Sequence, residues 1–452
     1  MYFIYIMINK VFDLCKNYKD IPQVIKPVKR IVAIGDVHGD FEYLIHLLKT
    51  ALVIDNEHHW IGGKTHVVQL GDQIDSCRPN YCDCNEKEST QNDKADDIKI
   101  INYLEKLHDE AVEDGGAVIS LLGNHELMNI DGDMSYVSYK NIQEVGGIGK
   151  RRQLFSKDGE VGKKLICTHP AIVIIGSNLF VHAGVLPRLI DNLPHIKETY
   201  RETIRNHIST MNNKEIVNLF LNCIIHGHIN KNDIAKIDDK HTLFWEQLYL
   251  DDFDKKKFAY QLKSNTHILS DLINKSEQIK NYLVNNIQVF KLDQMHSIEI
   301  INEVVKLWLF DKLHNEEVLE NVKSIFWNRI IGSIPNEEHK NSDSETCKTH
   351  VNPVLKFFNM NHMIVGHTPQ YIANQSGINY SCGSSVAKVD IGGANAFNTF
   401  DGEYVKTGKK MKTRIPQVLV IDNDKNFRIL YRETPTFSGG KFLDFFEYFY
   451  YM

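Results

Sequence analysis

Five apolar segments of the chain end in residues that can bind metal ions or transfer protons. They are IVAIGDVHG, VVQLGDQID, ISLLGNHE, LFVHAG and MIVGHTP. Each has the pattern of a buried strand, and sites in layered α/β sheets assemble at the carboxyl ends of strands. An unpaired carboxylate is costly to bury at such an end unless a cation meets it. We therefore expect the five strand ends to converge on one cation-binding crevice.

Two carboxylates, one amide and three imidazoles come from these segments. They are Asp36, His38, Asp72, Asn124, His182 and His367. This mixture of oxygen and nitrogen donors, without a thiolate, suits divalent Mn, Fe, Zn or Co. Asp36 and His38 are two residues apart, so in an extended segment they point the same way and can share one ion. Asp72 can bridge two ions about 3.5–4 Å apart, an arrangement that serves in-line phosphoryl transfer.

A candidate proton donor lies beside these ligands. His125 follows Asn124, and its protonated imidazole could deliver a proton to a leaving oxygen. Asp75, three residues after Asp72, is the natural partner because a nearby carboxylate favours the protonated form. We expect His125 to be the acid and Asp75 the group that orients it.

The segments that carry these residues alternate between strand and helix patterns. A strand pattern at 30–35 precedes helical spacing at 41–52, for which Asp40 is the expected N-cap. A strand at 65–72, a helix over about 94–113 and a strand reaching Gly123 follow. This order predicts a layered α/β fold with a mostly parallel sheet. Hairpins are expected at 171–184 and 417–433.

Changes of composition divide the chain into five parts. They are an N-terminal extension at 1–29, the first part of a core at 30–187, a helical insertion at 188–320, the second part of the core at 321–437 and an aromatic tail at 438–452. The insertion is nearly free of glycine and shows helical apolar spacing. The strands on both sides of it are expected to share one core.

Bulk composition narrows the class of protein. With 42% hydrophobic and 24% charged residues and a net charge of -6, the chain is typical of a folded globular protein. It has no long Lys/Arg run, so no nucleic-acid partner is expected. No apolar stretch is long enough for a membrane span, and the N-terminus lacks signal-peptide features. Together with the eight cysteines of a large chain, this favours reduced thiols and a cytoplasmic location.

Three further groups of residues compete for functional roles. His226 and His228 are rival ligands to His367, which is preferred because its segment follows a strand pattern. The thiols at 77, 82 and 84 do not match a closed zinc site, so reduced surface cysteines are expected, with a zinc clip or a redox switch as alternatives. Arg151 and Arg152 could line a substrate groove, although a solvated charge run is the commoner interpretation.

The motifs GDVHG, GDQID, GNHE, VHAG and VGHTP resemble the calcineurin-like metallophosphoesterase superfamily, on its phosphoprotein phosphatase side. The spellings FVHAG and IVGHTPQ look most like Shewanella-like phosphatases and related enzymes of large DNA viruses. The resemblance covers about 30–187 and 320–435. It implies a β-sandwich flanked by helices, a centre of two divalent ions (Mn, Fe or Zn), a metal-bridging hydroxide as the nucleophile, and no phosphoenzyme.

The resemblance also implies roles for particular residues. It places Asp36 and His38 on the first metal, and Asp72 between the two metals. Asn124, His182 and His367 would hold the second metal. His125 with Asp75 would supply the acid.

The phosphate-binding residues depart from the family pattern. The second motif of the family normally continues Asp-Arg-Gly, whereas here Asp75 is followed by Ser76 and Cys77 before Arg78. Arg78 can reach the same phosphate oxygens from this later position, because a guanidinium offers several donors in a fork. Arg329, in FWNR, resembles the second phosphate-binding arginine of the family. Asn124 is a further phosphate-binding candidate.

These inferences predict a metal-dependent phosphomonoesterase that acts on phosphoproteins at phosphoserine or phosphothreonine, with phosphotyrosine as a further substrate. Hydrolysis of a dinucleoside polyphosphate or another small phosphate ester is the alternative reaction. A non-catalytic phosphate-binding protein is a third interpretation, motivated by the missing arginine after Asp75. A nuclease is less favoured, because that branch ends in Gly-His-x-His and a basic face is lacking.

Overall fold

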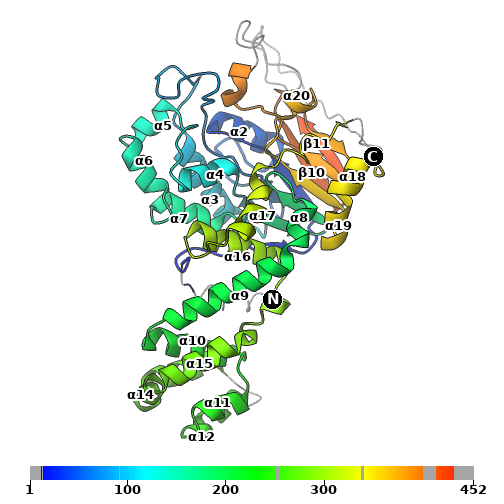
Figure 1. The fold of residues 1–452 in the computed structure, drawn as a ribbon. Coiled ribbons are helices and arrows are strands. Elements are labelled where there is room, and N and C mark those ends of the chain that lie inside the picture. Colours follow the sequence, from blue (N-terminus) through cyan, green and yellow to red (C-terminus); the bar gives the residue numbers. More distant parts are fainter. Residues whose placement is uncertain are drawn as a thin grey trace. The chain divides into compact units, whose positions relative to one another are not determined.

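A computed structural model describes residues 12, 14–90, 92–249, 254–336, 341–400 and 414–431 of the chain (Figure 1). The chain divides into two compact units. One consists of Pro194–Ile300 with residues that precede Lys19, and the other of Lys19–Leu193 with the residues from Ile301 onward. The predicted aromatic tail at 438–452 lies outside the described residues.

The larger unit contains a five-stranded sheet in the order β11-β10-β2-β3-β4. Its strands are β2 (Arg30–Ile34), β3 (His66–Gln69), β4 (Ala117–Ser120), β10 (Gln417–Asp422) and β11 (Asn426–Tyr431). The run β2, β3 and β4 is parallel, with Val32 opposite Val67 and Val67 opposite Val118. β10 pairs antiparallel with both β2 and β11, and β10 and β11 form the predicted hairpin. The carboxyl ends of β2, β3 and β4 therefore lie along one edge of the sheet.

The second sheet has six strands in the order β1-β5-β6-β7-β9-β8. Its strands are β1 (Val24–Ile25), β5 (Ile172–Ile175), β6 (Asn178–Val181), β7 (His362–Val365), β8 (Asn379–Ser381) and β9 (Val386–Lys388). β5 and β6 form the other predicted hairpin, and Gly176 has a φ of +61° in its turn. β6 pairs in parallel with β7, although 180 residues separate them in the sequence. The strands before and after 194–300 thus share one sheet.

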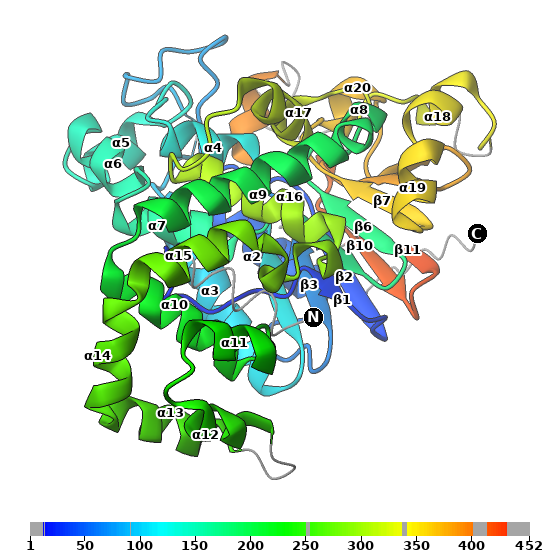
Figure 2. The same cartoon turned by 60° about the horizontal axis from the view of Figure 1, so that its bottom comes forward.

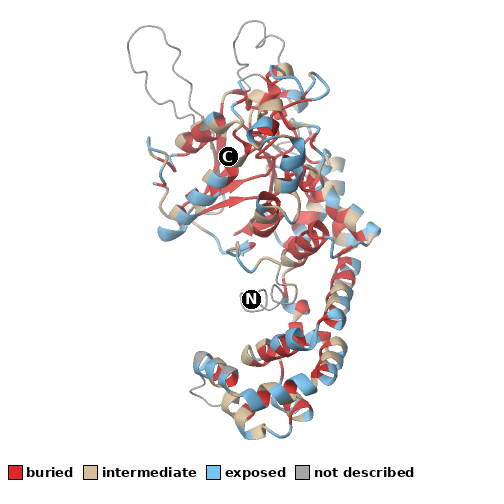
Figure 3. Cartoon of the chain, turned by 90° about the vertical axis from the view of Figure 1, so that its left-hand side faces the viewer, coloured by how far each residue is buried: buried red, intermediate tan, exposed pale blue. Residues whose placement is uncertain are grey.

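The two sheets pack face to face. A buried cluster joins Ile31, Ala33 and Val68 of the first sheet to Phe180 and Ile364 of the second. Figure 2 shows β6 and β7 beside β10 and β2, and Figure 3 shows the strands as the buried part of this unit. The predicted α/β fold, a sandwich flanked by helices, is confirmed. Both sheets are mixed. Five of the nine described strand pairs are parallel, and the antiparallel ones are the two predicted hairpins together with the β10–β2 and β8–β9 pairs.

Two helices cover the outer face of the five-stranded sheet. They are α2 (Phe41–Thr50) and α3 (Asp97–Glu113). Leu44 and Leu48 of α2, together with Ile100 and Leu104 of α3, pack against strand residues such as Val32. Asp40 caps α2 as expected, because its Oδ1 accepts a 2.9 Å hydrogen bond from the N–H of Tyr43.

The remaining helices fall into two groups. Those of the larger unit are α4 (Asn124–Ile130), α5 (Tyr139–Glu144), α6 (Ile148–Phe155), α7 (Glu160–Thr168), α8 (Pro187–Asp191), α17 (Glu316–Trp327), α18 (Glu345–His350), α19 (Asn352–Phe358) and α20 (Gln370–Ala373). Those of the smaller unit are α10 (Asn213–Ile225), α11 (Lys231–Ile237), α12 (Thr242–Glu246), α13 (Lys255–Ser264), α14 (Thr266–Asn274) and α15 (Ser276–Asn285). Two helices contain the unit boundaries, α9 (Leu193–Thr210) and α16 (Ser297–Leu309).

The smaller unit is helical throughout its described part. α10, α14 and α15 pack on one another through apolar faces that include Phe220, Leu272 and Leu283. Its boundaries, Pro194 and Ile300, lie inside the predicted insertion of 188–320. No helix among the described residues combines the length and the apolar character needed to cross a membrane.

Disulfides replace the reduced thiols that the sequence suggested. Cys77 is bonded to Cys84, and Cys347 to Cys382. Cys82 carries a free thiol whose Sγ lies 3.3 Å from that of Cys77. The expectation of reduced cysteines is therefore wrong for these two pairs, because the backbone brings their sulfur atoms within bonding distance. Reduced cysteines therefore no longer support a cytoplasmic location.

Acid sensitivity of the fold is predicted from His169, which is buried at the C-terminus of α7. Burial, followed by the charge of Lys164, lowers the pKa of its imidazole from 6.5 to about 3. Between these values the unfolded chain binds a proton that the folded protein excludes, so the free energy of unfolding falls as the pH is lowered from 6.5. The expected loss is about 2 kcal/mol between pH 6.5 and 5, at about 1.4 kcal/mol per unit. Urea unfolding of His169→Gln at pH 7 and 5 should show a weaker pH dependence.

His314→Gln, which changes an exposed histidine, is the matched control for this measurement. Its unfolding should keep the pH dependence of the wild type. An unchanged slope in His169→Gln would contradict the assignment.

Candidate active site

The strand ends of both sheets deliver the predicted ligands to one place. Asp36 and His38 follow β2, Asp72 follows β3, and Asn124 begins α4 just after β4. His182 and His367 follow β6 and β7 of the other sheet. Because β6 and β7 are parallel and the two sheets face each other, all six side chains lie at the same edge of the sandwich.

Four residues of this edge have strained backbones. His38, Asp72, Asp75 and His367 have φ values of 46°, 53°, 72° and 65°. Residues other than glycine rarely adopt this left-handed region, and such strain concentrates at functional sites. Hydrogen bonds help to hold the conformation, since the carbonyl oxygen of Asp72 accepts from the N–H groups of Val37 and His38 at 3.0 and 2.9 Å.

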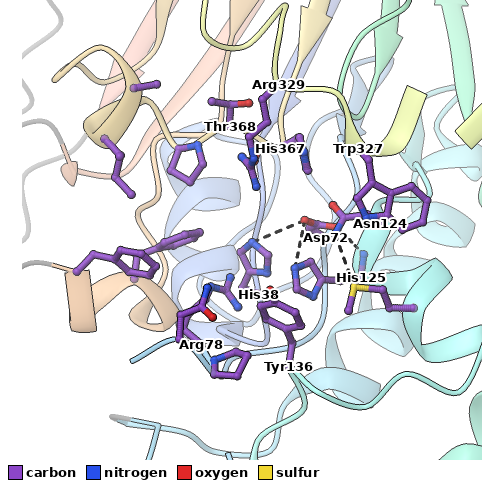
Figure 4. A pocket seen from close by; sticks show the side chains of 18 of the residues that line it. His38, Asp72, Arg78, Asn124, His125, Tyr136, Trp327, Arg329, His367 and Thr368 are labelled. Carbon is purple, nitrogen blue, oxygen red and sulfur yellow. Dashed lines mark hydrogen bonds and ion pairs between the residues drawn. The ribbon is translucent and has the colours of Figure 1, made fainter. Parts of the chain in front are cut away.

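Asp72 is the centre of the cluster. Its Oδ2 lies 3.4 Å from His182 Nε2, 3.8 Å from His38 Nε2 and 3.9 Å from His125 Nε2. Figure 4 shows His38 and His125 directed toward this carboxylate. The other ring nitrogens of His38 and His182 lie 3.2 and 2.7 Å from the carbonyl oxygens of Ile74 and Leu70. These bonds present both Nε2 atoms to Asp72, which is how metal-binding histidines are oriented.

The other predicted ligands surround the same point. His182 Nε2 lies 3.0 Å from Asn124 Oδ1 and 3.1 Å from His367 Nδ1. The N–H of His367 donates to both carboxylate oxygens of Asp36 at 3.1 Å. His38 Nε2 lies 3.8 Å from Asp36 Oδ2. The structure therefore brings together all six residues predicted to bind metal.

The donor set fits divalent metal ions. One possible ligand group contains His38, Asp72 and His125, and another contains Asp72, His182 and His367, so Asp72 belongs to both. His367 Nε2 is buried without a hydrogen-bond partner among the described residues. Buried carboxylates, imidazoles and an unpartnered ring nitrogen in one place are the chemistry of a metal centre.

Several ionisable side chains at this edge of the sandwich have pKa values that differ from the usual ones. Burial, followed by the carboxylates of Asp390 and Asp72, raises the pKa of Asp36 well above its usual range. Burial also acts to raise the pKa of Asp72, but the neighbouring imidazoles, His182 foremost, overcome it and hold that pKa well below its usual range. Burial, then the Arg78 charge, lowers the pKa of His38. Burial likewise lowers the pKa of His367, whereas at His182 burial is outweighed by its partners, the Asp72 carboxylate foremost, which raise the pKa. The neutral form that metals require is thus favoured at His38 and His367.

The predicted acid pair is formed. His125 Nδ1 lies 2.9 Å from Asp75 Oδ2, and both residues are buried. The Nδ2 group of Asn129 donates to both oxygens of Asp75, at 3.0 and 2.9 Å. With Nδ1 engaged by Asp75, the Nε2 atom of His125 faces the cavity and the Asp72 carboxylate.

A cavity of about 780 Å³ opens onto this cluster, a volume typical of small-molecule sites. His38, Asp72, Asn124, His125 and His367 all line it (Figure 4). Aromatic rings occupy much of the remaining wall. They are Tyr81, Tyr136, Trp327, Phe397 and Phe400.

Both predicted arginines line the cavity. Arg78 is buried, its Nη1 donates to the carbonyl oxygens of Asp75 and Cys77 at 3.0 and 2.7 Å, and its guanidinium lies 4.6 Å from the centre of the Phe397 ring. Arg329 is exposed, and its Nη1 donates to the carbonyl oxygen of His367 at 2.9 Å. Figure 4 shows Arg329 beside His367 and Arg78 beside His38. The cavity wall therefore carries two cations, as an anionic group requires.

Comparison with known families decides the class of this site. The model of the calcineurin-like phosphoesterase family matches residues 29–267. The chain belongs to the calcineurin-like phosphoesterases. The predicted family, and with it a phosphoester-hydrolysing enzyme, is confirmed. Metal-dependent chemistry agrees with the ligand clusters around Asp72.

Several proteins resemble this calcineurin-like phosphoesterase over part or most of its length. Uncharacterized protein R398 of Acanthamoeba polyphaga mimivirus is 28% identical over 73% of this chain and 97% of its own. Shewanella-like protein phosphatase 2 of Arabidopsis thaliana is 30% identical over 38% of this chain and 51% of its own. Shewanella-like protein phosphatase 1 of Plasmodium berghei is 33% identical over 34% of this chain and 39% of its own. The chain thus spans 51% and 39% of the lengths of the two named phosphatases.

Two buried acids at the centre of this phosphoesterase were missed from the sequence. Glu126 accepts hydrogen bonds from the N–H groups of Asp72, Gln73 and Gly123, and thereby ties the second motif to the third. Asp390 follows β9 and raises the pKa of Asp36. A signal was present, since KVDIGG is a further apolar run that reaches an acid and glycines at its end.

The rival histidines belong to the helical unit. His226 ends α10, and His228 Nδ1 lies 2.8 Å from the carbonyl oxygen of Val289. Neither joins a ligand group among the described residues, whereas His367 does. We expect His367→Ala to lose about one of two bound ions per chain and His226→Ala to retain both. Metal content after dialysis measures this, and loss confined to His226→Ala would contradict the assignment.

Both interpretations of Arg151 are wrong. The side chain neither lines the cavity nor contacts solvent, because it is fully buried within the larger unit. Arg152 is exposed, and its Nε donates to the carbonyl oxygen of Gly132, as the solvated interpretation expects.

Proposed function

We propose that this chain is a two-metal phosphomonoesterase that removes phosphate from phosphoproteins, first of all from phosphoserine and phosphothreonine. One observation carries the proposal. One cavity is lined by the histidine assigned as the proton donor, by both arginines and by four of the six predicted ligands, which are His38, Asp72, Asn124 and His367. This combination meets the needs of phosphoryl transfer, which are positioning and charge stabilisation.

Each group of side chains has a distinct task in this proposal. Arg78 and Arg329, which both line the cavity, hold phosphoryl oxygens. The protonated imidazole of His125 gives its Nε2 proton to the leaving alkoxide, while Asp75 holds Nδ1 and stabilises the charged ring. A serine or threonine leaving group needs that proton, because its alkoxide is strongly basic.

The family resemblance assigns the metal ligands, and the contacts of Asp36 with His38 and of Asn124 with His182 support that assignment. Asp36 and His38 would hold the first ion, Asn124, His182 and His367 the second, and Asp72 both. Mn, Fe and Zn all suit these donors. When bound, two such ions lower the pKa of water and offset the charge that develops on the phosphoryl oxygens.

The comparisons and the residues that line the cavity both indicate which substrates to test. Similarity to two proteins named as protein phosphatases supports a phosphoprotein substrate. The rings of Tyr136, Trp327 and Phe397 beside the cluster give a specific reason to test phosphotyrosine, since its ring can pack on them. Arg78 in the wall supports phosphate binding despite the missing arginine after Asp75.

Phosphate release tests the proposal. Mn-loaded protein is given phosphoserine, phosphothreonine and phosphotyrosine peptides and a dinucleoside polyphosphate. Peptide turnover that falls at least tenfold in Arg78→Met, without loss of bound metal, is expected. Turnover of the dinucleotide alone would move the chain to the nucleotide alternative. Binding of two ions without turnover of any substrate would favour the phosphate-binding protein.

A further inference from the structure

A fully buried arginine lies behind the acid pair, on the side away from the cavity. Arg151, on α6, donates through Nη2 to Asp97 Oδ2 at 2.7 Å. Its Nε and Nη2 both donate to Asn129 Oδ1, at 3.1 and 3.0 Å. Burying a guanidinium is costly, so a chain that keeps one there needs these partners to offset the loss of water.

Arg151 determines which way the Asn129 amide faces. Because the amide oxygen accepts two hydrogen bonds from the arginine, its NH₂ group must point at Asp75, to which it donates at 3.0 and 2.9 Å. A flipped amide would turn its oxygen toward the Asp75 carboxylate and repel it. Arg151 Nη2 also lies 3.6 Å from Asp75 Oδ1.

The charges of this buried group depend on one another. Asp97 accepts Arg151 on Oδ2 and the N–H of Asp75 on Oδ1. Burial raises the pKa of Asp97 to about 7, against the pull of the arginine. Arg151 is thus the cation that contacts both buried carboxylates, Asp97 at 2.7 Å and Asp75 at 3.6 Å.

We infer that Arg151 is a positioning residue of the reaction: through Asn129 and Asp97 it holds the Asp75 carboxylate in the orientation that presents His125 to the leaving group. The inference rests on the proposed function. Arg151 itself does not touch the cavity and acts only through these neighbours. It therefore supports proton donation more than metal binding or phosphate binding.

Variants can separate this role from a purely structural one. Arg151→Met leaves Asp97 buried without its cation and is expected to lower the melting temperature. The double variant Arg151→Met with Asp97→Asn removes both charges and should recover stability. Arg152→Met, an exposed neighbour on the same helix, is the matched control.

The leaving group supplies the decisive measurement. Nitrophenolate leaves without a proton, whereas a serine alkoxide needs one, so loss of acid catalysis affects the two substrates differently. In the double variant, kcat for a phosphoserine peptide should fall at least tenfold, with kcat for p-nitrophenyl phosphate within about threefold and KM little changed. Equal losses on both substrates, or full recovery of peptide turnover together with stability, would overturn the inference.

A spectroscopic measurement is independent of turnover. In Zn-loaded protein labelled with ¹⁵N-histidine, the Nδ1–H of His125 bonded to Asp75 should give a downfield proton resonance, identified by its absence in His125→Asn. The double variant should lose this resonance and Arg152→Met should keep it. If the wild type hydrolyses neither substrate, the proposed function fails, and this resonance still decides the role of Arg151: retention in the double variant would overturn it.

Discussion

Asp72→Asn is expected to lower kcat/KM for a phosphopeptide by about 10³-fold or more, equivalent to about 4 kcal/mol of transition-state stabilisation, and to reduce the bound metal. Asp72 is the carboxylate nearest to three imidazoles and the one residue shared by both ligand groups of the described chain. Its loss removes a negative charge from both possible ligand groups and should therefore weaken the binding of divalent cations.

Asparagine is a suitable replacement because it tolerates the left-handed backbone of position 72, where φ is 53°. It can also keep the hydrogen bond that Asp72 Oδ1 accepts from the N–H of His125 at 3.0 Å. The fold should therefore survive, and circular dichroism checks it. Asp109→Asn, at an exposed pair with Lys19, makes the same change outside the site. Two bound ions with wild-type turnover in Asp72→Asn would refute the role of Asp72.

His125→Asn is expected to lower kcat for a phosphoserine peptide by about 10²- to 10⁴-fold, the range usual for loss of a general acid. Metal content should be preserved, because the ligands assigned to both ions remain. The loss should be much smaller for p-nitrophenyl phosphate, whose leaving group needs no proton. Steady-state rates on the two substrates, with metal analysis, measure this.

His66→Asn provides the control for that substitution. His66 begins β3, the strand whose other end delivers Asp72, so the change is made in the same element but away from the site. It should leave both rates near those of the wild type. Full activity of His125→Asn on the peptide would contradict proton donation by His125.

The positions of the predicted ligands could be inferred from the sequence because each follows a strand pattern. Parallel strands place their carboxyl ends at one edge, so Asp36, Asp72 and Asn124 had to be neighbours once β2, β3 and β4 paired. The acid pair could be inferred for a similar reason. Asp75 lies three residues after the predicted ligand Asp72, and His125 directly follows the predicted ligand Asn124. Opposite charges favour the contact between Asp75 and His125.

Other features depend on contacts that no local pattern encodes. Arg151 lies 76 positions from Asp75 along the chain, and its burial follows from how α6 packs against α4. Glu126 ties together two loops only because β3 and β4 are adjacent. The bond between Cys347 and Cys382 joins residues 35 positions apart, and spacing alone does not predict such pairs.

By itself, the sequence determined the chemistry available to this protein: the types of ligand, their order along the chain and the strand ends that carry them. Strand periodicity and turn residues are local properties, so they can be recognised from the sequence alone. Only the tertiary structure decided how the two sheets share one edge, which side chains face the cavity, and which buried charges support the acid. Those outcomes depend on packing between segments that are distant in the sequence. Burial changes the free energy of an ionised side chain far more than the residues next to it in the sequence do.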